Sequence, residues 1–161
     1  MKRFTALFLL IITSATAQND EVAINTLLNN WHKAAANANF NDYFKVLSDD
    51  AIYIGTDATE NWNKTQFEAF AKPYFDKGKA WSFTALERHI YFSKDKKTAW
   101  FDELLNTQMK ICRGSGVLVK VKNIWMIKHY VLSMTIPNET TNEVVKAKTT
   151  IEDAIIDKLK K

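Results

Sequence analysis

The side chains of this sequence that could do chemistry lie mainly between residues 99 and 133. Arg113, His129 and Ser133 fall in two stretches of alternating apolar residues, which is the pattern of half-buried strands. A three-residue turn at 122–124 pairs Val117 with His129, and Arg113 with Ser133. These three polar side chains would then share the apolar inner face of a sheet. Polar groups in such a place must be partnered or must line a cavity.

The alternative is a two-residue turn at 122–123, which would pair Val119 with Met126 and place Lys128 on the valine face. A one-residue slip moves every side chain of a strand to the opposite face of the sheet. Because a lysine is costly on an apolar face, the pattern favours the three-residue turn. That turn pairs Val119 with Ile127 and leaves Lys128 on the wetter face.

The preceding strand carries a carboxylate on each of its faces. Trp100 and Asp102 share one face and Glu103 lies on the other, and alternation does not decide which face is inner. Either choice places one carboxylate inside, so we expect an ion pair with Arg113. A buried carboxylate beside His129 would have its pKa moved toward neutrality, as a general base needs. The catalytic candidates are Asp102, Glu103 and His129, and the same groups would serve equally as a structural network.

Aromatic residues would complete a pocket around these groups. Its expected lining is Tyr53, Trp62, Trp100, Asp102, Arg113, His129 and Ser133. The aromatic members would serve equally as core residues. No cofactor is expected, because no glycine-rich phosphate loop precedes a helix. The three histidines lack metal-ligand spacing, which indicates no metal site. Cys112, the single cysteine, is expected to be a packed thiol.

The first residues have the pattern of a secretory signal peptide. Lys2 and Arg3 precede an apolar run over 4–12, and Ala15-Thr16-Ala17 follows as a small-x-small cleavage site. We expect cleavage after Ala17 and export to the periplasm or the medium. Loss of Lys2 and Arg3 would lower the formal charge from +4 to +2. No basic stripe suggests nucleic acid, and no later segment suggests a membrane anchor.

Periodicity predicts the elements that must position these residues. Helical patterns cover 20–39 and 41–47, and a third helix begins with a capping box at Thr65 and Glu68, is disturbed by Pro73 and stops at Gly78. Strands are predicted over 51–55, 81–93, 98–109, 112–122 and 125–136. An amphipathic helix within 139–161 is expected to dock through Val144, Val145, Ile151 and Ile155, on its own domain or on a partner's.

Helices followed by a long antiparallel meander predict an α+β fold. Long strands in a small sheet must curl, which gives a cone-shaped domain over 18–138. The N-terminal helices would pack on one face of its curved antiparallel sheet, and an added C-terminal helix follows.

Four motifs in order carry a resemblance to a known family. They are Glu60-Asn61-Trp62, Ala99-Trp100-Phe101-Asp102-Glu103, Arg113-Gly114-Ser115-Gly116-Val117-Leu118-Val119 and Trp125-x-Ile127-x-His129-x-x-x-Ser133. Over about 21–138 the chain resembles the SnoaL-like branch of the nuclear transport factor 2-like superfamily. The resemblance implies a cone with helices over its concave side, and frequent dimers. Members of this branch often carry a second polar residue, commonly His, at the strand position that Val131 holds here.

The superfamily includes isomerases, cyclases, dehydratases, epoxide hydrolases and non-catalytic binding domains, so three functional hypotheses stand. The first is a domain that binds a small, partly apolar ligand in the cone. The second is an acid–base enzyme of isomerase, cyclase or hydrolase type that uses the buried carboxylate with Arg or His. The third is a dimeric interaction module.

Overall fold

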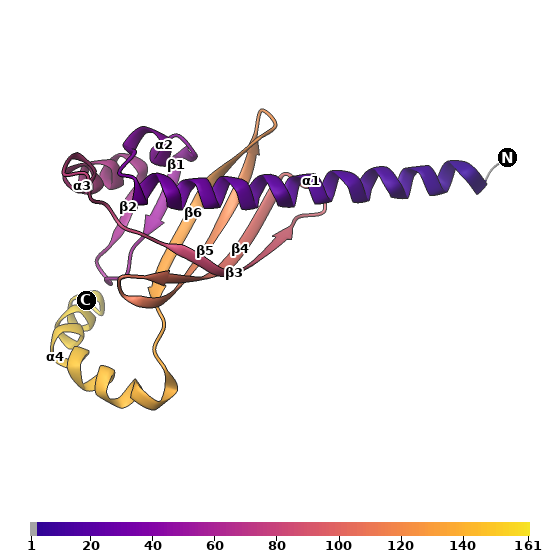
Figure 1. Ribbon diagram of the computed structural model, residues 1–161. Helices are drawn as coiled ribbons and strands as arrows, with labels where there is room; N and C mark the ends of the chain where they lie inside the picture. The colour runs from indigo at the N-terminus through magenta and orange to yellow at the C-terminus, as the bar shows by residue number, and fades with distance from the viewer. Residues whose placement is uncertain (1–2) are drawn as a thin grey trace.

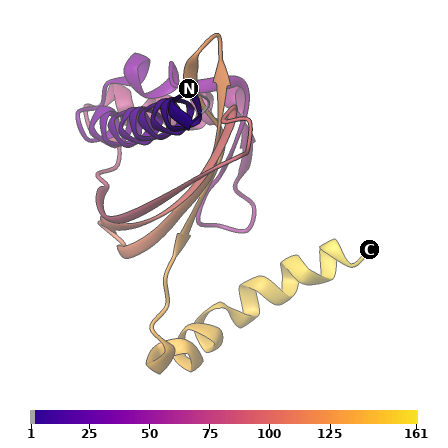
Figure 2. The same ribbon diagram turned by 90° about the vertical axis from the view of Figure 1, so that its right-hand side faces the viewer.

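The structure is a computed structural model that describes the backbone of residues 3–161 and the side chains of residues 20–161. A curved six-stranded sheet in the order β2-β1-β6-β5-β4-β3 carries the long helix α1 over its concave face (Figures 1 and 2). The elements are α1 (Arg3–Ala36), α2 (Phe40–Phe44), β1 (Leu47–Ile54), β2 (Asn61–Asn63), α3 (Lys64–Asp76), β3 (Thr84–Phe92), β4 (Thr98–Thr107), β5 (Lys110–Val121), β6 (Ile124–Met134), a 3-10 turn (Asn138–Thr140) and α4 (Thr141–Leu159). This is the α+β cone that the sequence predicts.

Helix α1 forms because its apolar residues recur every three or four positions. Ile24, Leu28, Trp31 and Ala35 are all buried against the sheet. The helix also extends past the sheet toward its N-terminus (Figure 1). Within residues 3–161, no helix is both long enough and apolar enough to cross a bilayer.

The sheet is antiparallel except where β1 runs parallel to β6. Strands β3 to β6 follow one another as a meander, as the alternating pattern predicts. The parallel pair arises because β1 and β2 form a separate hairpin that joins the meander along β6. The sheet therefore continues past the meander, and the concave face gains the side chains of β1 and β2.

The β5–β6 turn differs from the predicted one. Val121 pairs with Ile124 across a two-residue turn at Lys122 and Asn123, whose φ angles are 49° and 65°. Two consecutive positive φ values are what a tight hairpin turn of type I′ requires. The predicted three-residue turn is therefore wrong.

A β-bulge restores the rest of the predicted register. Leu118 pairs with Ile127, but the next residue, Val117, pairs with His129, so the strand shifts by one residue near Lys128. An extra residue on one strand of a pair reverses the faces of the side chains beyond it. Ser133 consequently lies opposite Arg113, as predicted. Both residues are on the face opposite to the expected one, because β5 buries Gly114 and Gly116 rather than its valines.

The N-cap of helix α3 is Asn63, two residues before the predicted cap at Thr65. The Asn63 side chain accepts the amide of Gln66, and the Gln66 side chain accepts the amide of Asn63, which makes a reciprocal capping box. The helix continues through Pro73, where the sequence predicts a kink or an irregular turn. It ends before Gly78, whose φ of +68° suits a glycine stop.

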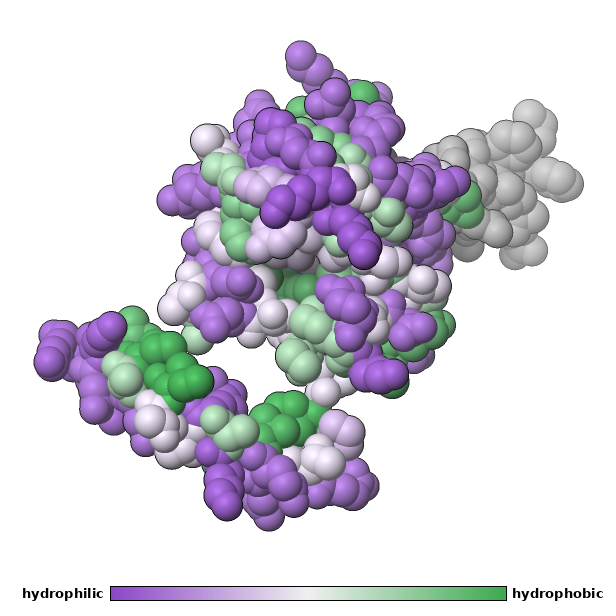
Figure 3. All heavy atoms as spheres, turned by 60° about the vertical axis from the view of Figure 1, so that its left-hand side comes forward, coloured by the Kyte–Doolittle hydropathy of each residue, from purple (hydrophilic) through white to green (hydrophobic). Residues whose placement is uncertain are grey.

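Helix α4 stands apart from the domain (Figure 2). None of its residues is buried, and Ile151 is 68% exposed. Apolar side chains gather along this helix and face open space (Figure 3). The expected docking on its own domain is therefore wrong. Docking on a partner stays a prediction.

Candidate functional site

The predicted pocket residues fall on two faces of the sheet. Tyr53 is buried on the concave side and Trp62 is half-buried beside it, with ring centroids 6.3 Å apart. The others lie on the convex face: Trp100 is 46% exposed, Arg113 and Ser133 are exposed, and Asp102 and His129 are half-buried. The structure therefore does not bring the predicted set together around one cavity.

The inner face of β5 carries glycines rather than the valines that the prediction placed there. A Cβ on Gly116 would lie 2.5 Å from the carbonyl oxygen of His129 and 2.7 Å from Cε1 of Phe101. One on Gly114 would lie 3.0 Å from Cγ of Glu103. Large side chains from the neighbouring strands fill the space over these glycines. Sequence alternation alone cannot distinguish this arrangement from a valine-lined core.

Glu103 is the carboxylate that lies inside, and its partner is Arg88 rather than Arg113. Nε and Nη2 of Arg88 donate to Oε2 of Glu103 at 2.9 and 2.6 Å. His32 Nε2 lies 2.9 Å from the other carboxylate oxygen, and the Tyr130 hydroxyl donates to that oxygen at 3.3 Å. The side chain of Glu103 is 0% exposed and that of Arg88 is 6% exposed.

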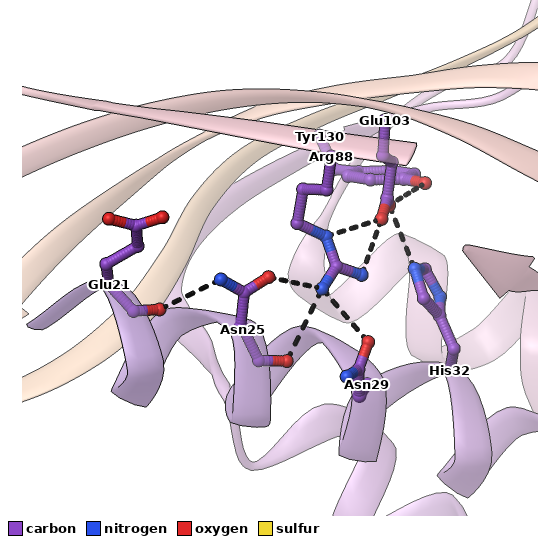
Figure 4. A network of polar contacts seen from close by, with 7 residues as sticks. All are labelled: Glu21, Asn25, Asn29, His32, Arg88, Glu103 and Tyr130. Carbon is purple, nitrogen blue, oxygen red and sulfur yellow. Dashed lines mark hydrogen bonds and ion pairs between the residues drawn. The ribbon is translucent and has the colours of Figure 1, made fainter. Parts of the chain in front are cut away.

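The network extends from Arg88 to helix α1 (Figure 4). Nη1 of Arg88 donates to the side-chain oxygens of Asn25 at 3.1 Å and of Asn29 at 2.9 Å. Asn25, Asn29 and His32 occupy one stripe of the helix, beside its buried apolar stripe. The network therefore ties α1 to β3, β4 and β6. The sequence signal for it was this polar stripe together with the position of Arg88 in an alternating strand.

The electrostatics of Glu103 favour its ionised form. Burial acts to raise the pKa of this carboxyl, but the hydrogen bond and charge of His32 and the Arg88 guanidinium outweigh it and hold the pKa below its ordinary value. Burial and the Glu103 charge raise the pKa of Tyr130 well above its ordinary value. Both carboxylate oxygens are already hydrogen-bonded, so Glu103 is poorly suited to accept a proton from a substrate.

His89 and Asp102 form a separate pair on the convex face, with Nδ1 and Oδ1 3.2 Å apart. Both side chains are about half exposed, at 50% and 44%. The two carboxylates that the sequence offered as alternatives therefore have different partners. Asp102 is the solvent-facing one. Across the part of the chain that the structure describes, no cluster of three or more His, Cys, Asp or Glu residues could hold a metal ion.

A pocket of about 190 Å³ opens at the end of the cone, between β1, β2, α3, the segment before β3 and the β4–β5 turn. We call it the aromatic pocket. Its walls include Tyr53, Trp62, Phe67, Phe70, Trp81 and Phe83, and its polar lining includes Thr56, Glu60 and Gln108. Tyr53 and Trp62 are the predicted pocket residues that line it, and sequence analysis missed the others.

Five of the six aromatic rings that wall the aromatic pocket have similar orientations. Those of Tyr53, Trp62, Phe70 and Trp81 each lie within 23° of parallel to the Phe67 ring. The Trp62 and Phe70 centroids are 4.4 Å apart. Rings stacked on one another contact through their inner faces, so their edges and outermost faces remain to contact a flat or apolar group.

Comparison with known proteins agrees with this architecture. The chain matches the SnoaL-like domain family over residues 24–137. An NTF2-like protein of unknown function from Pseudomonas putida superposes with a TM-score of 0.63 at 15% identity, covering 78% of this chain and 92% of that one. No curated protein matches the chain.

Two further solved structures carry provisional activities. An NTF2-like protein from Streptomyces avermitilis, provisionally assigned as a dehydratase, has a TM-score of 0.65 at 8% identity and covers 75% of this chain and 99% of that one. A protein from Novosphingobium aromaticivorans, provisionally assigned as an aromatic ring hydroxylase, has a TM-score of 0.63 at 12% identity and covers 74% and 91%. At these identities the likeness concerns the fold.

Proposed function

This chain belongs to the SnoaL-like domain family, and we propose that it binds a small, partly apolar ligand in the aromatic pocket. The observation that carries the proposal is the pocket itself: about 190 Å³ walled by aromatic rings, with few polar groups among its lining. Ligand sites are typically concave and apolar, with a small number of placed polar groups. An apolar cavity of about 150 Å³ is enough for benzene. The pocket therefore suits a ligand with one ring or a short aliphatic chain.

Binding is favoured over acid–base catalysis because both oxygens of the buried Glu103 carboxylate already accept hydrogen bonds. A general base needs a free lone pair and a pKa near the working pH. Glu103 accepts hydrogen bonds on both oxygens, and its pKa is held below the ordinary value. The other sequence candidates, Asp102 and His129, lie on the convex face, away from the aromatic pocket.

The test uses benzyl alcohol, a neutral one-ring probe, followed by ligand-observed NMR and calorimetry. Phe70→Ala removes part of the pocket wall at a side chain that is already 37% exposed, so folding should tolerate it. We expect this variant to weaken binding by about fivefold or more, since it deletes a ring from the contact surface. Tyr91→Ala is the matched control, because Tyr91 is a 46% exposed aromatic residue that does not line the pocket.

Two results would contradict the proposal. One is the absence of any binding at millimolar concentration of benzyl alcohol and of its charged analogues benzylamine and benzoate. The other is equal weakening by Phe70→Ala and by Tyr91→Ala, which would locate the probe elsewhere.

We also propose that the chain is exported after removal of residues 1–17. Lys2 lies outside the described residues, and residues 3–17 belong to the N-terminal part of α1, the end at which the helix extends past the sheet (Figure 1). Asp20 is tied to the sheet, since its Oδ1 accepts from Lys120 Nζ at 2.7 Å and from Trp125 Nε1 at 3.0 Å. Cleavage after Ala17 would keep these contacts and leave Asp20 near the new helix N-terminus, where a carboxylate is favourable.

A further inference from the structure

We propose that the ligand of the aromatic pocket is an organic cation: a small ammonium compound that carries one ring or a short apolar chain. This inference rests on the proposed binding function. It assigns to Glu60 the recognition of the charge, and to the aromatic rings the recognition of the apolar part.

The charge of the pocket lining points to a cation. Glu60 is the one acidic residue of the lining, which contains no Lys, Arg or His. Glu60 is half-buried, and in the part of the chain whose side chains are described it forms no ion pair. A carboxylate in an apolar setting without a cationic partner attracts a cation from solution and repels an anion.

The Glu60 carboxylate is held in place by the chain around it. Its Oε2 accepts a hydrogen bond from the amide of Asp57 at 3.1 Å. The side chain also lies against Gly55, where an added Cβ would collide with the same oxygen. Glycine at position 55 therefore leaves room for the carboxylate at the end of β1. The position of the charge is set by the backbone, as a binding site needs.

The field of Glu60 reaches the floor of the pocket. Burial is the main reason that the pKa of the Tyr53 hydroxyl lies above its ordinary value, and the negative charge of Glu60 is the second reason. Tyr53 therefore stays neutral and adds no second charge. A cation bound near Tyr53 would lie within the influence of the carboxylate.

The aromatic walls favour the same ligand class. The faces of aromatic rings carry partial negative charge, so they attract ammonium groups, and cages of such rings are a known means of binding them. Trp62 and Phe70 lie stacked at the pocket, and Phe67 is parallel to both within 17°. A carboxylate of the ligand would meet both the Glu60 charge and the ring faces, and both would repel it.

The test compares three probes that share a ring and differ in charge: benzylamine, benzyl alcohol and benzoate. Each is titrated at neutral pH and low ionic strength into the purified chain, and binding is followed by calorimetry. We expect benzylamine to bind at least tenfold more tightly than benzyl alcohol, and benzoate to bind most weakly. Added salt should reduce the preference for benzylamine, because it screens the partly exposed carboxylate.

Glu60→Gln removes the charge and nearly preserves the shape of the side chain. Glutamine keeps an oxygen that can accept from the Asp57 amide, so the turn should be preserved. We expect this variant to bind benzylamine no better than benzyl alcohol, because it lacks the charge that distinguishes the two probes. Glu68→Gln is the matched control, since it makes the same change on α3 outside the pocket lining. It should leave the preference for benzylamine intact.

The outcomes separate this inference from the function on which it rests. Binding of benzyl alcohol or benzoate as tight as that of benzylamine overturns the cation inference and leaves the aromatic pocket as a ligand site. A preference for benzylamine that persists in Glu60→Gln overturns the role of Glu60. Failure of all three probes to bind overturns the proposed function, and this inference with it.

Discussion

Replacing Arg88 or Glu103 alone should destabilise the domain far more than replacing the exposed Arg113. The Glu103 side chain is 0% exposed and that of Arg88 is 6% exposed, so neither charge is screened by water. Breaking a buried pair by deleting one partner costs about 3–5 kcal/mol. Arg88→Met leaves the carboxylate with only its hydrogen bonds from His32 and Tyr130. Glu103→Leu leaves a buried guanidinium with only neutral oxygens of α1.

The double variant Arg88→Met, Glu103→Leu should cost less than the sum of the two single changes, by about 1–3 kcal/mol. It removes both charges together, so no uncompensated ion remains. It does leave His32 Nε2 and the Tyr130 hydroxyl without their shared acceptor, at about 1–3 kcal/mol. The double variant should therefore still be less stable than the original chain.

The assay is urea unfolding at neutral pH of the original chain, the two single variants and the double variant. A domain of this size has about 5–15 kcal/mol of total stability, so single variants should fold with a much reduced midpoint. Arg113→Met is the matched control, because Arg113 is exposed and should change stability by less than about 0.5 kcal/mol. A loss of stability smaller than about 1 kcal/mol in both single variants would refute the reasoning. Strict additivity of the two losses in the double variant would also refute it.

Three further outcomes are expected. The folded-state pKa of Glu103 lies below its ordinary value of 4.5. The contribution of Glu103 to stability should therefore be present above pH 4.5 and be lost as the pH falls through the folded-state pKa. Between neutral and acidic pH, the urea midpoint should fall less steeply in Glu103→Gln than in the original chain. Gly116→Ala should lower the free energy of unfolding by about 1–3 kcal/mol, because the added Cβ collides with Phe101 and a backbone carbonyl. Ser115→Ala should change the stability little, and equal effects of the two variants would contradict the close packing. Mass spectrometry of protein from the native host should find a chain that begins at Gln18, and retention of Lys2 would disprove export by this signal.

The sequence determined most of the helices and strands, because their periodicities are local, but it did not predict the short strand β2. The recurrence of Ile24, Leu28, Trp31 and Ala35 predicts α1 without knowledge of what covers it, and strand alternation predicts β3 to β6. The cap of α3 was predicted at Thr65, two residues late, for a local reason as well. Asn63 with Gln66 and Thr65 with Glu68 both fit a cap, and the end of β2 at Asn63 places the helix start at the first pair.

The residue types of the buried polar network around Glu103 were partly predicted from the sequence. A buried carboxylate with an arginine and a histidine was expected, and the structure contains that chemistry in Glu103, Arg88 and His32. The individual partners were wrong, since Arg113 and His129 lie on the convex face. The residue types of this buried polar network were therefore predictable, and their assignment was not. Of the aromatic pocket, the sequence indicated only Tyr53 and Trp62.

The tertiary structure alone decided which face of the sheet is inner. An alternating strand has the same pattern whichever face is buried, so its sequence cannot distinguish the two. The packing of α1 breaks this symmetry, and the bulge near Lys128 then sends His129 and Ser133 outward while Tyr130 and Leu132 turn in. The aromatic pocket depends on the same long-range packing, because its walls come from segments that are distant in the chain and meet only when the cone closes.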